Sequence, residues 1–124
     1  MAGWPYLVAG VLTILLGGAH GVIGERTFLR RVRASALPRY DQRTLRLVWH
    51  LFTVAMVVTG ALLVAISTAR VDVAAGRALA VILGAWGVFF AVYVAAIDPR
   101  LLVRVPQPLL LMGAALLAWF GGGP

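Results

Sequence analysis

Cysteine, lysine and asparagine are all absent from this chain of 124 residues, and Asp and Glu together number only four. Without cysteine the chain has no disulfide bond, no thiolate metal site and no CxxC motif, which excludes a quinone-coupled thiol oxidoreductase built on four helices. Charged residues make up 12% of the sequence, whereas hydrophobic residues make up 62% and the mean hydropathy is +0.97. This balance excludes an ordinary soluble domain and indicates a membrane protein.

Four apolar segments are separated by short connections, at about residues 4–23, 45–67, 74–97 and 101–120. About 20 helical residues, at about 1.5 Å each, cross the ~30 Å hydrocarbon core of a bilayer. The connections are too short to hold a separate soluble domain. The sequence therefore predicts an all-α fold, an integral membrane four-helix bundle that forms a single transmembrane domain over residues 1–124.

The fourth segment has two interpretations, because it contains Arg104, Pro106 and Pro108. Either one helix starts near Leu101 and kinks, or the helix begins at Pro108 with Gln107 beside its start. The second helix would cover only about thirteen residues, roughly 20 Å. A helix of that length has to thin the bilayer or lean on a partner protein.

Arginine is concentrated in the basic connection between the first two segments, residues 25–44, and just beyond it. Seven arginines lie between Arg26 and Arg46, while the second connection carries only Arg70 and Arg77, and the third connection also carries two. The positive-inside rule therefore places the first and third connections in the cytoplasm and both termini on the non-cytoplasmic side. The net charge of +7 then reflects topology and not nucleic-acid binding. The arginines expected to contact anionic lipid headgroups are Arg26, Arg30, Arg31, Arg33, Arg43 and Arg46.

Small residues recur at helical spacing on the first and third segments, and they predict where helices approach closely. The first segment carries Gly10, Gly17 and Gly21, of which the last two form a GxxxG pair. The third carries Gly84 and Gly87. We expect these stripes to pack the protein's own helices against one another. The alternative is that they mediate self-association or docking to other membrane-protein subunits.

The only two histidines, His20 and His50, lie inside apolar segments on either side of the basic connection. Each lies on a face with small or polar residues and roughly 6–8 Å inside its helix end, so both imidazoles are expected to point inward at similar depth. Glu25 is the nearest carboxylate in the sequence. Its five-residue offset turns it about 140° away from His20 on a straight helix, so we expect Glu25 to pair with the neighbouring arginines.

Three interpretations of the histidine pair remain open. In the first, each imidazole hydrogen-bonds a hydroxyl, a backbone carbonyl, Glu25 or Gln107 across the bundle. In the second, His20 and His50 bind a haem iron between facing helices, or a transition metal completed by Glu25. In the third, these three residues exchange protons with a quinone or a transported ion. The chain contains no local metal motif such as HxxxH, which favours the first interpretation.

Two short pieces carry a resemblance to other proteins. Residues 20–26 read HGVIGER and residues 49–53 read WHLFT. They resemble the HxxxGER and WHxxT pieces of uncharacterised small bacterial four-helix inner-membrane proteins, a resemblance that implies a bacterial inner-membrane location and no established activity. Small multidrug exporters carry a glutamate in the middle of their first span, whereas Glu25 follows the span here. Fluoride channels require an asparagine-bearing core, which this chain lacks.

The sequence therefore predicts a non-enzymatic accessory or structural subunit that packs against other membrane proteins and lipids. The first alternative is a histidine-ligated haem or metal redox membrane protein. The second is a small proton- or ion-coupled transporter.

Overall fold

The computed structural model describes residues 3–68 and 73–121, so Arg70 and Asp72 of the second connection lie outside the described residues. Every regular element in these two ranges is a helix, which confirms the predicted all-α class. Three stretches are long and apolar enough to cross a membrane by length and composition: Trp4–Arg33, Arg39–Thr68 and Val73–Ile97. The elements in chain order are α1 (Trp4–Arg26), α2 (Phe28–Arg33), α3 (Arg39–Thr68), α4 (Val73–Ile97), α5 (Leu101–Arg104) and α6 (Gln107–Phe120).

The fourth apolar segment is divided into α5 and α6. Its main helix, α6, has 14 residues and starts at Gln107, as in the shorter of the two interpretations. Pro106 is the N-cap residue, and Pro108 lies in the first turn, where a missing backbone N–H removes no intrahelical hydrogen bond. At about 1.5 Å per residue α6 is about 21 Å long, well short of the ~30 Å bilayer core.

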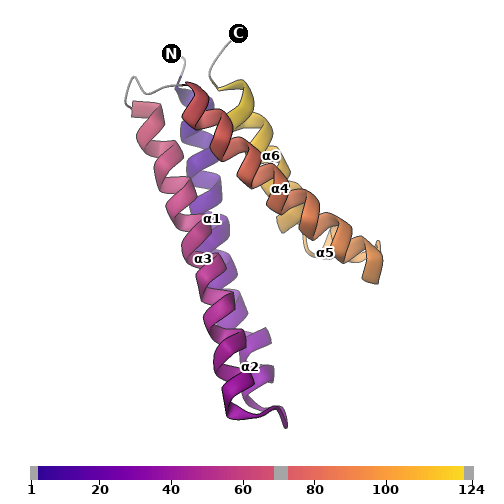
Figure 1. Cartoon of the computed structure of the whole chain (residues 1–124). Coiled ribbons are helices and arrows are strands. Elements are labelled where there is room, and N and C mark those ends of the chain that lie inside the picture. Colours follow the sequence, from indigo (N-terminus) through magenta and orange to yellow (C-terminus); the bar gives the residue numbers. More distant parts are fainter. Residues whose placement is uncertain (1–2, 69–72, 122–124) are drawn as a thin grey trace.

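The helices form two hairpins, α1 with α3 and α4 with α6, which are joined chiefly by contacts between α1 and α6. The hairpins converge at one end and separate toward α2 and α5 at the other (Figure 1). Tyr6 lies at the converging end, where its buried ring contacts Gly76 at the start of α4 and Gly121 after α6.

Glycines bring α1 and α3 into backbone contact. A Cβ added at Gly10 would lie 2.6 Å from the carbonyl oxygen of Gly60, and one added at Gly60 would lie 2.6 Å from that of Gly10. Farther along α1, Gly17 lies against Met56 and Gly21 against Thr53. In this structure the small-residue stripe of α1 lies against α3.

The α4 glycines lie beside α6, but the two are packed differently. A Cβ at Gly87 would lie 2.6 Å from Cγ of Met112 and 3.1 Å from the carbonyl oxygen of Pro108. A Cβ at Gly84 would meet only Ala115, at an ordinary 3.6 Å. Both positions lie beside α6, and the close approach is at Gly87. The buried apolar cluster comprises Tyr6, Ala9, Met56, Leu63, Ala80, Leu83, Leu111, Ala114, Ala115 and Ala118.

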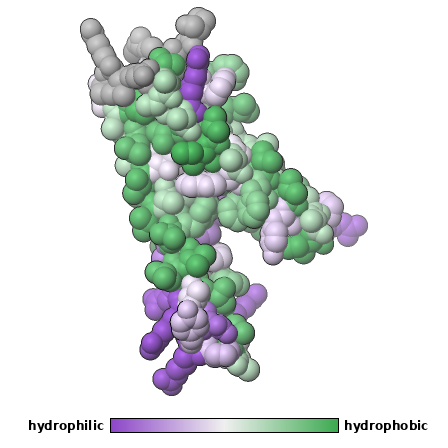
Figure 2. Space-filling model, in the orientation of Figure 1, coloured by the Kyte–Doolittle hydropathy of each residue, from purple (hydrophilic) through white to green (hydrophobic). Residues whose placement is uncertain are grey.

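The surface agrees with a membrane location. Figure 2 shows hydrophobic side chains over most of the visible face, while hydrophilic side chains gather chiefly at the α2 end, with fewer at the tip of the second hairpin and at the converging end. Leu15, Leu47 and Leu51 are among many large apolar side chains that remain exposed. Apolar surface this continuous is stable where hydrocarbon, or another apolar protein surface, replaces water.

Candidate functional site

Glu25, near the end of α1, joins three helices. Its Oε2 accepts a hydrogen bond from Nη1 of Arg33 on α2 at 2.8 Å. Its Oε1 accepts from Nε of Arg46 on α3 at 2.7 Å and lies 2.8 Å from Nε2 of His50. Because an ionised carboxylate only accepts, His50 is the donor in this contact. The predicted pairing of Glu25 with arginines is confirmed, and Glu25 reaches His50 on the neighbouring helix.

The contacts of Glu25 orient the basic connection but contribute little to its stability. The side chains of Arg33 and Arg46 are about half exposed, and solvent weakens ion pairs of that kind. Both guanidinium groups are nevertheless oriented toward the same carboxylate, so α2 folds back against the start of α3. The contacts with Glu25 therefore fix the direction in which the basic connection leaves α1.

The imidazole of His20 is held by aromatic rings. It stacks on Trp49 of α3, with ring centroids 4.2 Å apart and planes 7° from parallel, and it meets Phe52 edge-on at 5.3 Å. Nε1 of Trp49 donates a hydrogen bond to the backbone carbonyl of His20 at 3.1 Å, and Phe28 of α2 also stacks on the indole, with ring centroids 4.9 Å apart. Trp49 therefore links α1, α2 and α3 through a single side chain.

Sequence analysis missed this role of Trp49. The indole lies so close to Gly24 that a Cβ there would collide with it. The glycine four residues after His20 and the tryptophan before His50 are the two signals in the sequence, but nothing local pairs them. Only the crossing of α1 and α3 brings these positions together.

Gln107, at the start of α6, connects His20 to the second hairpin. Nε2 of Gln107 lies 3.3 Å from Nδ1 of His20 and 3.6 Å from Sδ of Met56. With Gln107 donating, Nδ1 accepts and the ring proton lies on Nε2. Within the described residues, that Nε2 is buried and has no hydrogen-bond partner. The Gln107 contact is one of those expected in the first interpretation of the histidines.

The histidines and Glu25 are not assembled as a ligand set. His50 contacts Glu25, whereas His20 contacts Gln107 and Trp49. Across residues 3–68 and 73–121, no group of three His, Asp or Glu side chains could hold a metal ion. These surroundings do not fit a metal site made of His20, Glu25 and His50 together, because His50 lies against Glu25 while His20 lies against Gln107 and Trp49.

A cavity of about 590 Å³ lies between the hairpins, where α1 faces the break between α5 and α6. Its walls are mostly apolar. Most of its polar side chains are partly occupied by bonds within the protein, while Arg104 makes no ion pair with any residue in the described ranges. The lining residues are Leu16, Ala19, His20, Ile23, Gly24, Thr27, Trp49, Phe90, Arg104, Val105, Pro106, Gln107 and Leu110.

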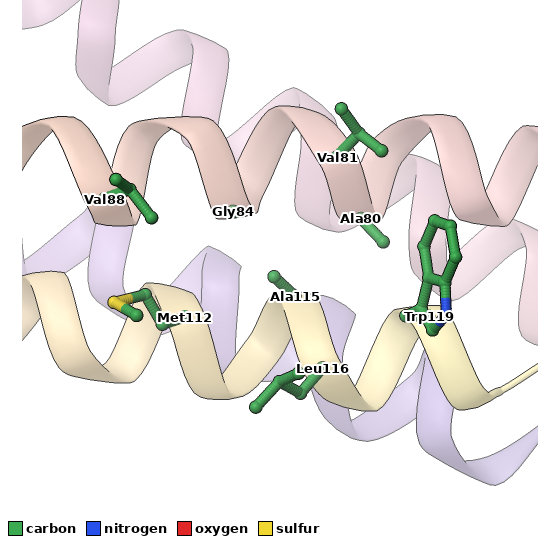
Figure 3. A pocket seen from close by; sticks show the side chains of 8 residues that line it. All are labelled: Ala80, Val81, Gly84, Val88, Met112, Ala115, Leu116 and Trp119. Atoms are coloured by element: carbon green, nitrogen blue, oxygen red, sulfur yellow. The ribbon is translucent and has the colours of Figure 1, made fainter.

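Two smaller hollows differ sharply in chemistry. Figure 3 shows an apolar groove of about 280 Å³ between α4 and α6, with Gly84 and Ala115 facing each other and Trp119 toward one end. The other, also about 280 Å³, lies at the basic end and is lined by Arg33, Arg39, Gln42, Arg43 and Arg46. The first suits hydrocarbon, and the second suits anions such as lipid headgroups.

Comparisons with protein-family models, curated proteins and solved structures gave no match. The resemblance carried by the HxxxGER and WHxxT pieces therefore stays a prediction. What the site does has to be argued from its own geometry.

Proposed function

We propose that the chain is a four-span protein of the bacterial inner membrane with both termini on the non-cytoplasmic side. It serves as a non-enzymatic accessory or structural subunit that packs against other membrane proteins and lipids. The observation that supports this proposal most is that residues 88–97 of α4, beyond the reach of the short helix α6, include no buried residue.

The buried residues of α4 all lie in its first fifteen positions: Gly76, Ala80, Leu83 and Gly87. Residues 88–97 include no buried residue, and they are almost entirely apolar. The reason is the length of α6, whose second residue, Pro108, already lies against Gly87. Because α6 runs back from that point, it cannot cover the rest of α4.

The uncovered segment is long enough for a helix of another protein. It presents bulky side chains at helical spacing, among them Phe89, Val92 and Tyr93. A short α6 leaves about 9 Å of the bilayer core unspanned on this side, a mismatch that a neighbouring helix can fill. Bulky and aromatic side chains pack against such a helix through van der Waals contact, which drives helix association in lipid.

The basic end supports the lipid part of the proposal. Arg39 and Arg43 line the hollow there and form no ion pair within residues 3–68 and 73–121. Glu25 neutralises part of the charge of Arg33 and Arg46. The remaining positive charge is suited to the anionic headgroups of a cytoplasmic leaflet.

Site-specific photocrosslinking in cells tests the proposal. A benzophenone amino acid is placed at Val92 in one variant and at Leu15 of α1 in the control, because the two side chains are equally exposed, at 64%. We expect the probe at Val92 to give a single protein adduct that also co-purifies at a fixed ratio in mild detergent, and the probe at Leu15 to give none. An isolated monomer without adducts, or equal adducts at both positions, contradicts the accessory-subunit proposal.

A further inference from the structure

We infer that the cavity between the two hairpins binds one amphipathic anion, a hydrocarbon chain that ends in a phosphate or carboxylate group. The hydrocarbon lies along α1, and the anionic head lies at Arg104. This inference needs the cavity and its charge only, and it does not depend on a protein partner at α4.

The size and the lining of the cavity suit such a molecule. About 590 Å³ lies within the roughly 300–1,000 Å³ typical of small-molecule sites. Leu16, Ala19 and Ile23 recur along one face of α1 and form one wall, while Phe90 and Leu110 contribute apolar surface from the second hairpin. The cavity is therefore a mostly apolar space bounded by both hairpins.

Most polar atoms along the α1 wall are already used within the protein, although Nε2 of His20 is buried without a hydrogen-bond partner among the described residues. The hydroxyl of Thr27 donates to the carbonyl of Ile23 at 2.7 Å, and Nε1 of Trp49 donates to the carbonyl of His20. Nδ1 of His20 lies against Gln107. A ligand that follows this wall therefore meets few free polar groups, which favours a hydrocarbon chain over a polar molecule.

Arg104 supplies the charge at the cavity mouth. Its side chain is exposed at the end of α5, and no Asp or Glu lines the cavity. No ion pair within residues 3–68 and 73–121 involves Arg104. A cation without a carboxylate partner, at the edge of an apolar space, complements an anion attached to a hydrocarbon chain.

The basic hollow at the α2 end is a different kind of site. Two of its arginines, Arg33 and Arg46, are paired with Glu25, and no apolar residue lines it. It offers contact to a headgroup alone. The cavity between the hairpins combines the positive charge of Arg104 with apolar space for the ligand's hydrocarbon chain. A test therefore has to separate ligand binding in this cavity from ligand binding to other surface arginines.

Native mass spectrometry of the purified chain in detergent makes that separation. The probes are dioleoyl phosphatidylglycerol, oleate and, as the zwitterionic control, dioleoyl phosphatidylcholine. Arg104→Gln removes the charge, and Ala19→Phe fills the cavity from an exposed position on its wall. Arg100→Gln is the matched control, because Arg100 is an exposed cation in the same connection that does not line the cavity.

We expect the wild-type chain and Arg100→Gln to retain one tightly bound anionic amphiphile per chain. Arg104→Gln should bind it at least 10-fold more weakly, and Ala19→Phe should lose it while keeping wild-type helix content. Tighter binding of phosphatidylglycerol identifies a membrane phospholipid as the source, and tighter binding of oleate identifies a free fatty acid. Equal binding by Arg104→Gln and wild type, or equal binding of phosphatidylcholine, overturns the inference.

If Ala19→Phe does not fold, Arg104→Gln and Arg100→Gln still decide the outcome, because both substitutions are at exposed positions. The measurement uses the isolated chain and involves no partner protein. Failure of amphiphile binding is thus distinguishable from failure of the accessory-subunit proposal, which is read from adducts at Val92.

Discussion

Replacement of Gly60 by alanine tests whether backbone contact between α1 and α3 holds the first hairpin together. The added Cβ would lie 2.6 Å from the carbonyl oxygen of Gly10 and 2.9 Å from the backbone nitrogen of Ile14. The helices would have to separate by about 0.8 Å to restore ordinary contact at 3.4 Å. Overpacking of this kind costs about 1–3 kcal/mol, and the better helix propensity of alanine returns about 0.5–1 kcal/mol.

We therefore expect Gly60→Ala to lower the free energy of unfolding by about 1–2 kcal/mol, measured by denaturant titration in detergent micelles. The control is Gly18→Ala on α1, where an added Cβ meets nothing within 4 Å. That variant should be unchanged or slightly more stable. Gly10→Ala disrupts the same contact, so the two losses in free energy of unfolding should not add in the double variant. Equal stability of Gly60→Ala and Gly18→Ala would refute the backbone-contact argument.

Three other substitutions test the site and the orientation. Trp49→Phe keeps a ring against His20 but removes the indole N–H, so the free energy of unfolding in the same titration should fall by about 1 kcal/mol; an unchanged value would argue against the hydrogen bond. Glu25→Gln removes the charge shared by its cationic neighbours, so the melting temperature should fall at low salt and the deficit should shrink at high salt. A deficit independent of salt would contradict the ion-pair explanation. Ser35→Cys and Thr68→Cys each give a single thiol in a chain without cysteine, and an impermeant maleimide should label Thr68→Cys in intact cells but Ser35→Cys only after lysis. The reverse pattern would invert the proposed topology.

Parts of the candidate site follow from local sequence. The offset between His20 and Glu25 predicts that they diverge on α1, and Glu25 does contact Arg33 and His50 instead. The spacing of Gly10 and Gly17 predicts that both face a neighbouring helix, and both lie against α3. Helical periodicity carries this information, because it fixes which residues of one helix share a face.

Other parts depend on how helices cross. Neither the insertion of Trp49 beside Gly24 nor the meeting of His20 with Gln107 has a local signal. The sequence predicts that the ring of His20 points inward. It does not predict the stacking on Trp49, because that contact depends on how α3 is oriented about its own axis. Pro106 and Pro108 allow two starting points for the fourth helix, and in the structure its main helix, α6, begins at Gln107.

The sequence by itself determined the membrane class, the basic connection and the small-residue faces, since hydropathy, charge and periodicity are properties of single segments. Tertiary structure alone decided that Glu25 joins His50, 25 residues away, and that His20 meets Gln107, 87 residues away. It also decided that the hairpins diverge around a cavity with Arg104 at its mouth. Contacts over such separations depend on helix length, crossing and rotation. The short length of α6 and the close crossing of α1 and α3 at their glycines determine these contacts. Both depend on how two helices pack, which the sequence of one segment does not specify.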